Sequence, residues 1–312
     1  MHALPLVVAS VLAVLMAPMV LRGLQAGGHV RRNYRRRELP FPFGVLSVAA
    51  ALVALIPIAL LQQLEGGDVL HPEAGPIALY VLGVALLGLI DDVLDTPRAG
   101  APLRPDAAAR PAVAARPDAA RGQHAGAEGA GPPNIPRGWR GHGAALLRGE
   151  LSTGMLKAAG SLGLALFVLS GEGRSNGHYL LAVAVLVLAT NLFNLLDLRP
   201  GRATKAFVLL GAGLTLGAAD VRPLWSLGLF VGPALVAGLY DLRERAMLGD
   251  TGANLLGALA GWWLVLALSV TGQEIALALL LAITVFGEFR SISALVEKTP
   301  GLRALDSLGR PS

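Results

Sequence analysis

The segment YLLAVAVLVLATNLFNLL, Tyr179–Leu196, carries no charged residue and ends on a motif with two asparagines. Its length approaches the ~20 apolar residues that cross a bilayer as a helix. Similar runs recur along the chain, in which 54% of the 312 residues are hydrophobic and only 15% are charged. A soluble domain of this size needs far more polar surface. The sequence therefore predicts an all-α integral membrane protein.

We expect about nine transmembrane helices, packed as one polytopic bundle. The first apolar run lacks the basic start of a signal peptide and exceeds its usual apolar length, which favours a retained span. Residues 1–312 then form a single transmembrane domain. The nine runs are Ala3–Leu21, Gly44–Leu61, Gly75–Ile90, Gly154–Leu169, Tyr179–Leu196, Ala203–Ala219, Pro223–Tyr240, Gly252–Val270 and Ile275–Phe289.

The basic residues predict the orientation. If the spans alternate and the amino terminus lies outside, all but two of the 26 Lys and Arg residues fall on one side, the exceptions being Arg174 and Arg222. The positive-inside rule makes that side cytoplasmic. We expect a bacterial inner-membrane protein with a cytoplasmic carboxyl terminus. The net charge of +5 follows from this topology and does not indicate a nucleic-acid partner.

Residues 97–140 differ from the rest because they are mostly Ala, Pro, Arg and Gly. Such a stretch buries too little apolar surface to offset its ordering entropy. We expect a disordered cytoplasmic insert within the single domain. The chain has no cysteine, so neither a disulfide nor a thiolate metal site is expected.

An acidic cluster, Asp91, Asp92 and Asp95, ends the third apolar run. On a continuing helix Asp91 and Asp95 share one face, where like charges repel unless they share a cation. Closely set carboxylates suit Mg²⁺. The alternative is that these acids only mark the solvated start of a loop. Three acids at the end of a membrane span favour a functional site over that alternative.

The fifth run ends on a second polar motif, Asn191, Asn194 and Asp197, whose spacing of three places them along one helix stripe. Buried without partners, each group costs about 1–3 kcal/mol. Hydrogen bonding between helices is the alternative to ligand binding.

A third motif, Leu248-Gly-Asp-Thr-Gly-Ala-Asn254, opens the eighth run. We expect Asp250 to be the N-cap of that helix, and the flanking glycines to let an anionic ligand approach its free N–H groups. Cations complete the set. Lys157 lies inside an apolar run. Its side chain either extends to the membrane surface or binds a phosphate. Arg199 and Arg202 follow the Asn/Asp motif.

Together these groups predict one wet cavity at the cytoplasmic face, with carboxylates for Mg²⁺ and cations for phosphates. That inventory suits phosphoryl transfer, which depends on positioning and charge neutralisation. A transporter is one alternative, although transporters bind near the midplane and these clusters lie at span ends. A catalytically inactive relative is the other.

The motifs, in their order along the chain, resemble those of the polyprenyl-phosphate sugar-1-phosphate transferases, which include phospho-N-acetylmuramoyl-pentapeptide transferase and the polyprenyl-phosphate N-acetylhexosamine-1-phosphate transferases. The resemblance covers the chain outside the insert. It rests on five segments: Asn33–Pro40, Asp91–Asp95, Ser152–Lys157, Asn191–Asp197 and Gly249–Gly252.

The resemblance implies that a UDP-sugar donates sugar-1-phosphate to a polyprenyl phosphate and releases UMP, in cell-envelope glycan biosynthesis. Mg²⁺, or Mn²⁺ in its place, is the implied cofactor. The implied partners are the lipid, the nucleotide sugar and the bilayer, with a homodimer left open. Catalytic and metal-binding roles fall to Asp91, Asp92 and Asp250, and substrate binding to Lys157, Asn191, Asn194, Asp197, Arg199 and Arg202. The family also carries a histidine-rich motif in its last cytoplasmic loop, whereas the six histidines of this chain form no cluster. We expect Arg199, Arg202 and Arg303 to supply the cationic contacts in their place.

Overall fold

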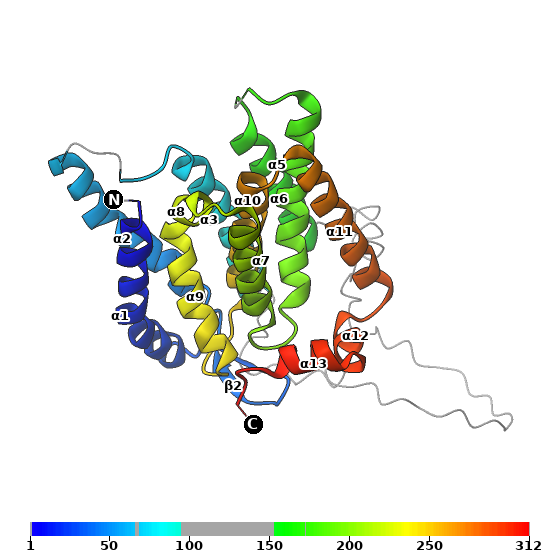
Figure 1. Ribbon diagram of the computed structural model, residues 1–312. Coiled ribbons are helices and arrows are strands. Elements are labelled where there is room, and N and C mark those ends of the chain that lie inside the picture. The colour runs from blue at the N-terminus through cyan, green and yellow to red at the C-terminus, as the bar shows by residue number, and fades with distance from the viewer. Residues whose placement is uncertain (1, 66–68, 95–152, 172, 312) are drawn as a thin grey trace, which may run out of the picture. The chain divides into compact units, whose positions relative to one another are not determined.

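The computed structural model describes residues 2–65, 69–94, 153–171 and 173–311 (Figure 1). These residues form helices and one antiparallel hairpin, β1 (Val30–Arg32) with β2 (Glu38–Pro40). The helices are α1 (Leu4–Ala26), α2 (Val45–Glu65), α3 (Ala74–Leu94), α5 (Thr153–Leu169), α6 (Asn176–Leu196), α7 (Arg202–Ala218), α8 (Arg222–Ser226), α9 (Gly228–Leu242), α10 (Gly249–Ala267), α11 (Val270–Phe289), α12 (Ile292–Lys298) and α13 (Pro300–Ser307). The predicted insert lies outside the described residues.

The apolar runs are helical, as expected. Five helices are long and apolar enough to cross a membrane: α1, α2, α3, α6 and α11. Helices α5 and α9 are apolar but shorter, and the seventh run divides into α8 and α9 at Leu227. The protein is therefore a helical, membrane-embedded protein, whereas nine crossings and their direction stay predictions.

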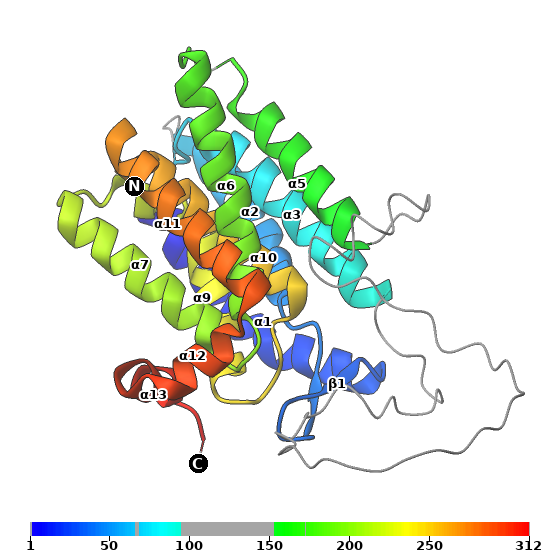
Figure 2. The same ribbon diagram turned by 90° about the vertical axis from the view of Figure 1, so that its right-hand side faces the viewer.

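Helix α10 forms the centre of the bundle and packs most extensively on α6 and α3 (Figures 1 and 2). It is buried along nearly its whole length. Small residues permit this close packing, because a Cβ on Gly257 would stand 2.6 Å from the Cα of Thr190 on α6. Because other helices surround α10, the polar motif at its start does not have to face lipid.

Glycine also brings the start of α10 against α3. A Cβ on Gly88 would stand 2.5 Å from the carbonyl oxygen of Asp250. On the other side, the segment after β2 fixes the loop before α10, because Phe43 N donates to Met247 O (2.7 Å) and Gly44 N to Leu248 O (2.9 Å). The motif at Asp250 is thus held between α3 and the hairpin segment.

Candidate functional site

Four helix ends meet at one end of the bundle and carry the polar motifs. Asp91 lies in the last turn of α3, Lys157 in the first turns of α5, Asn194 near the end of α6, and Asp250 at the start of α10. Helices α3 and α6 run toward this end of the bundle, whereas α5 and α10 run away from it. Motifs that are distant in sequence therefore lie close together.

The ammonium group of Lys157 joins these four residues. Its Nζ donates to Asp91 Oδ2 (3.0 Å) and also to Asp250 Oδ2. In the amide orientation that satisfies both neighbours, Asn194 donates to Asp250 Oδ1 (3.0 Å) and accepts from Lys157 Nζ (3.1 Å). The four side chains form one connected network, which we call the Lys157 cluster.

The Lys157 cluster is enclosed but not sealed. The side chains of Lys157 and Asp91 are 13% and 16% exposed, and that of Asp250 is 31% exposed. Two carboxylates face one ammonium group, so the cluster carries one surplus negative charge when all three groups are ionised. Such a site attracts a cation, and it repels a phosphorylated ligand that comes without one.

Asp92 has a different environment from Asp91. It is 3% exposed, and its carboxylate accepts hydrogen bonds from Asp250 N (2.9 Å), Thr251 N (2.9 Å) and Thr251 Oγ1 (2.7 Å). Asp92 therefore satisfies the first amides of α10 from a neighbouring helix. Its predicted role in metal binding stays a prediction, while these bonds supply a structural role that the sequence did not indicate.

Two expectations about the start of α10 are wrong. Asp250 is not the N-cap, because α10 begins at Gly249 after Leu248 and Asp250 lies within the first turn. The amides of Asp250 and Thr251 do not await a ligand, since Asp92 occupies them. The error arose because a capping group from another helix leaves no local sequence signal.

The remaining members of the Asn/Asp motif lie on either side of Asn194. Asn191 is half-buried one turn earlier on α6, and Asp197 directly follows that helix. Burial, followed by the nearby carboxylates of Asp241 and Asp250, raises the pKa of Asp197 well above its ordinary value. Asp95 lies outside the described residues.

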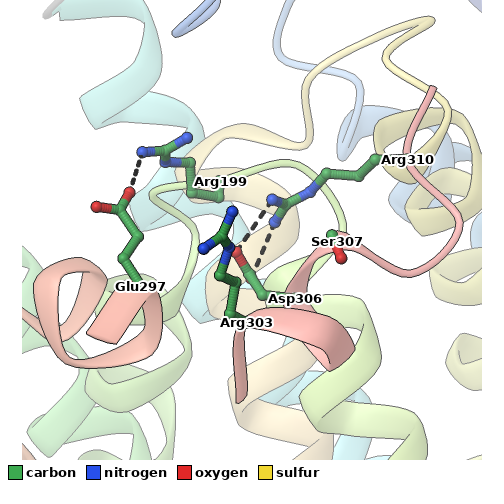
Figure 3. Close-up of a pocket in the computed structure, with 6 residues that line it drawn as sticks. All are labelled: Arg199, Glu297, Arg303, Asp306, Ser307 and Arg310. Carbon is green, nitrogen blue, oxygen red and sulfur yellow. Dashed lines mark hydrogen bonds and ion pairs between the residues drawn. The ribbon is translucent and has the colours of Figure 1, made fainter. Parts of the chain in front are cut away.

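Arg199 and Arg202 belong to a second site, formed with the carboxyl-terminal helices. Arg202 binds Asp306 through Nε (2.8 Å) and Nη2 (3.2 Å), and Arg199 pairs with Glu297 (2.6 Å). Figure 2 shows α13 below α7, away from the start of α5. A cavity of about 400 Å³ opens there, lined by Arg199, Glu297, Arg303, Asp306, Ser307 and Arg310 (Figure 3). We call it the arginine pocket.

The sequence reasoning missed two acids that organise this end of the bundle. Asp241 accepts from Gly201 N (2.6 Å) and Leu248 N (3.3 Å), which ties the loops before α7 and α10 together. The side chain of Glu244 is fully buried and binds Asn33 (3.3 Å) and Tyr34 (3.0 Å) of the early basic loop. Both acids follow an apolar run, which is the only signal that marks them.

The donor set at the Lys157 cluster fits Mg²⁺ in kind, because carboxylate and amide oxygens are the ligands that this hard cation takes. Among the described residues, however, no group of three or more acids or histidines is gathered closely enough to hold a metal ion. Two carboxylates would have to share the ion with oxygens of a bound ligand.

The comparisons with protein families and with curated proteins find no match. No model of a protein family matches the chain, and no curated protein is found to be similar to it.

Proposed function

We propose that this protein transfers sugar-1-phosphate from a UDP-sugar to a polyprenyl phosphate in the membrane and releases UMP. The observation that carries the proposal is the Lys157 cluster, in which groups of both charges converge at the ends of apolar helices. The resemblance of the five sequence motifs to those of sugar-1-phosphate transferases supplies the substrate class.

The location suits a reaction between a lipid and a water-soluble nucleotide. Asp91 and Asn194 lie in the last turns of helices that are long and apolar enough to cross a membrane. A prenyl chain in the bilayer would present its phosphate at this level, while the nucleotide would enter from water. The partial exposure of Asp250 and Lys157 leaves room for such an approach.

In the proposed reaction, an oxygen of the polyprenyl phosphate forms a bond to the sugar-bearing phosphorus. The bond from that phosphorus to the oxygen that bridges the two phosphorus atoms breaks, and UMP leaves with that oxygen. Lys157 would turn from Asp250 to the diphosphate and neutralise charge on its oxygens. Asn194 would orient the same group by hydrogen bonding, and Asp197, at the end of the same helix, is a further proposed substrate-binding residue.

A Mg²⁺ ion, when bound, would neutralise the diphosphate. Asp91 and Asp250 are the residues that would hold it together with phosphate oxygens. The reaction needs this cation because, when all three groups are ionised, the Lys157 cluster carries a surplus negative charge that repels a nucleotide diphosphate.

The test is UMP release by the purified full chain, with undecaprenyl phosphate, Mg²⁺ and a panel of UDP-sugars. Asp250→Asn keeps the size of the side chain and removes its charge. We expect turnover to fall on the order of 100-fold or more, while the protein still inserts and remains monodisperse. Weakened Mg²⁺-dependent binding of the nucleotide should accompany the loss.

The matched control is Asp220→Asn, which makes the same chemical change in an acid that pairs with the exposed Arg222 (2.8 Å). It should leave turnover unchanged. Near-normal turnover in Asp250→Asn would remove this residue from the reaction. If the wild-type chain released no UMP from any sugar in the panel, the transferase proposal would fall, and an inactive relative or a transporter would take its place.

A further inference from the structure

Helix α13 is held to the protein through Asp306 and its last carbonyl groups, and its leucines and the following Leu308 are exposed. Asp306 pairs with Arg202 and Arg310, and Lys205 donates to the backbone oxygens of Leu305, Asp306 and Leu308 at the end of the helix. Leu302, Leu305 and Leu308 are 42%, 38% and 65% exposed. An amphipathic helix in water packs with its apolar side on the protein, so this arrangement favours an apolar surrounding for the exposed leucines.

The position of α13 points to the membrane surface as that surrounding. Helix α11 is a candidate span whose end, Phe289, is exposed, and α12 begins three residues later at Ile292. A few residues reach at most ~3.6 Å each, which keeps α12 close to the end of that span. Figure 1 shows α12 and α13 lying across the ends of α6 and α7 rather than along them.

Next to the exposed leucines lies a cationic surface. In the arginine pocket, Glu297 neutralises Arg199, and Asp306 is shared by Arg310 and the neighbouring Arg202. The Arg303 guanidinium makes no hydrogen bond or ion pair with another residue in the described part of the chain. The pocket therefore holds surplus positive charge beside an apolar face.

We propose that α12 and α13 form an interfacial anchor for an anionic phospholipid. Leu302, Leu305 and Leu308 enter the acyl region, and Arg303 binds the headgroup phosphate at the arginine pocket. The charge of the pocket selects anionic over zwitterionic lipid, and the exposed leucines require the acyl chains rather than a free phosphate ion. This site is separate from the Lys157 cluster and does not depend on the proposed reaction.

The absence of cysteine from the chain makes a depth measurement direct. Spin labels would be placed at Leu305→Cys and, as the control on the opposite side of the helix, at Ser307→Cys, in nanodiscs that contain phosphatidylglycerol. We expect collisions with oxygen to dominate at position 305 and collisions with a water-soluble nickel chelate to dominate at position 307. A label at position 305 that is as accessible to nickel as one at position 307 would overturn the anchor.

Lipid selectivity is tested with Arg303→Gln and a matched change in another exposed arginine, Arg245→Gln. Losing one cation near the surface should weaken phosphatidylglycerol binding to the purified full chain about fivefold, measured by native mass spectrometry. Arg245→Gln and the binding of phosphatidylcholine should show no change. Equal loss in both variants would refute a specific role of Arg303. Displacement of phosphatidylglycerol by millimolar inorganic phosphate would show that the pocket takes free phosphate and would refute the lipid assignment.

Discussion

Substitution of the two adjacent aspartates Asp91 and Asp92 should affect different properties of the protein, activity in the first case and stability in the second. Asp92 is buried and accepts three hydrogen bonds from the first turn of α10. Asp92→Ala leaves these donors without an acceptor in a site that is 3% exposed. An unsatisfied buried donor costs about 1–3 kcal/mol, and loss of a charged cap costs about 0.5–2 kcal/mol. Because the carboxylate's own burial also carries a cost, we expect a net loss of about 3 kcal/mol.

Asp91→Asn is the internal control. Its carboxylate binds Lys157 at 3.0 Å, and Lys157 retains Asp250 and Asn194 when that charge is removed. We expect about 1 kcal/mol of destabilisation, the net contribution of one hydrogen bond, because Lys157 keeps its other partners. In the proposed reaction, Asp91→Asn should instead lower turnover. Position 92 thus acts on stability and position 91 on activity.

The assay is thermal loss of the monodisperse species in detergent, followed by size-exclusion chromatography. For a chain of 312 residues, about 3 kcal/mol corresponds to a midpoint lowered by roughly 5 °C. Thr251→Val removes only the hydroxyl donor to Asp92, so the double variant should lose less stability than the sum of the two single variants. Equal melting temperatures of Asp92→Ala and Asp91→Asn would show that the capping role of Asp92 is wrong. Additive losses of stability from Asp92→Ala and Thr251→Val would show the same.

Three further results are expected. In Gly88→Ala the new Cβ would stand 2.5 Å from the Asp250 carbonyl oxygen, so this variant should separate α3 from α10 and lower the melting temperature. In Gly163→Ala the new Cβ would meet nothing within 4 Å, so this variant should stabilise α5 by about 0.5–1 kcal/mol. Equal effects of the two substitutions would contradict the close approach of α3 and α10. Although partial burial opposes it, hydrogen bonds from arginines hold the pKa of Asp306 at about 2, below its ordinary 3.8. The resulting stabilisation is fully present above that ordinary value and is lost as the pH falls toward 2, so peptic cleavage of the carboxyl-terminal helices should accelerate over this interval in the wild type but not in Asp306→Asn. Reporter fusions at Arg174 and Arg245 should lie in opposite compartments, and a common compartment would refute the alternating spans.

The elements of the fold followed largely from local sequence. Apolar runs free of charge form helices, because a backbone in lipid must satisfy its own hydrogen bonds. The acids and amides that interrupt this pattern carry a cost in lipid, so their places near span ends were already informative. That reasoning predicted Asp91, Asp250, Asn194 and Lys157 as one group, and the structure brings these four into one network. Their catalytic and metal-binding roles stay predictions.

Tertiary packing decided the partner of each polar side chain. Successive residues of a helix point about 100° apart, so Asp91 reaches Lys157 while Asp92 reaches the amides of α10. Sequence spacing cannot distinguish them, because the choice depends on where Gly88 lets α10 approach. Arg202 was likewise expected to bind substrate, yet it pairs with Asp306, about a hundred residues away. Local sequence determined which groups leave the membrane, and only the packing of helices distant in sequence determined which of those groups meet.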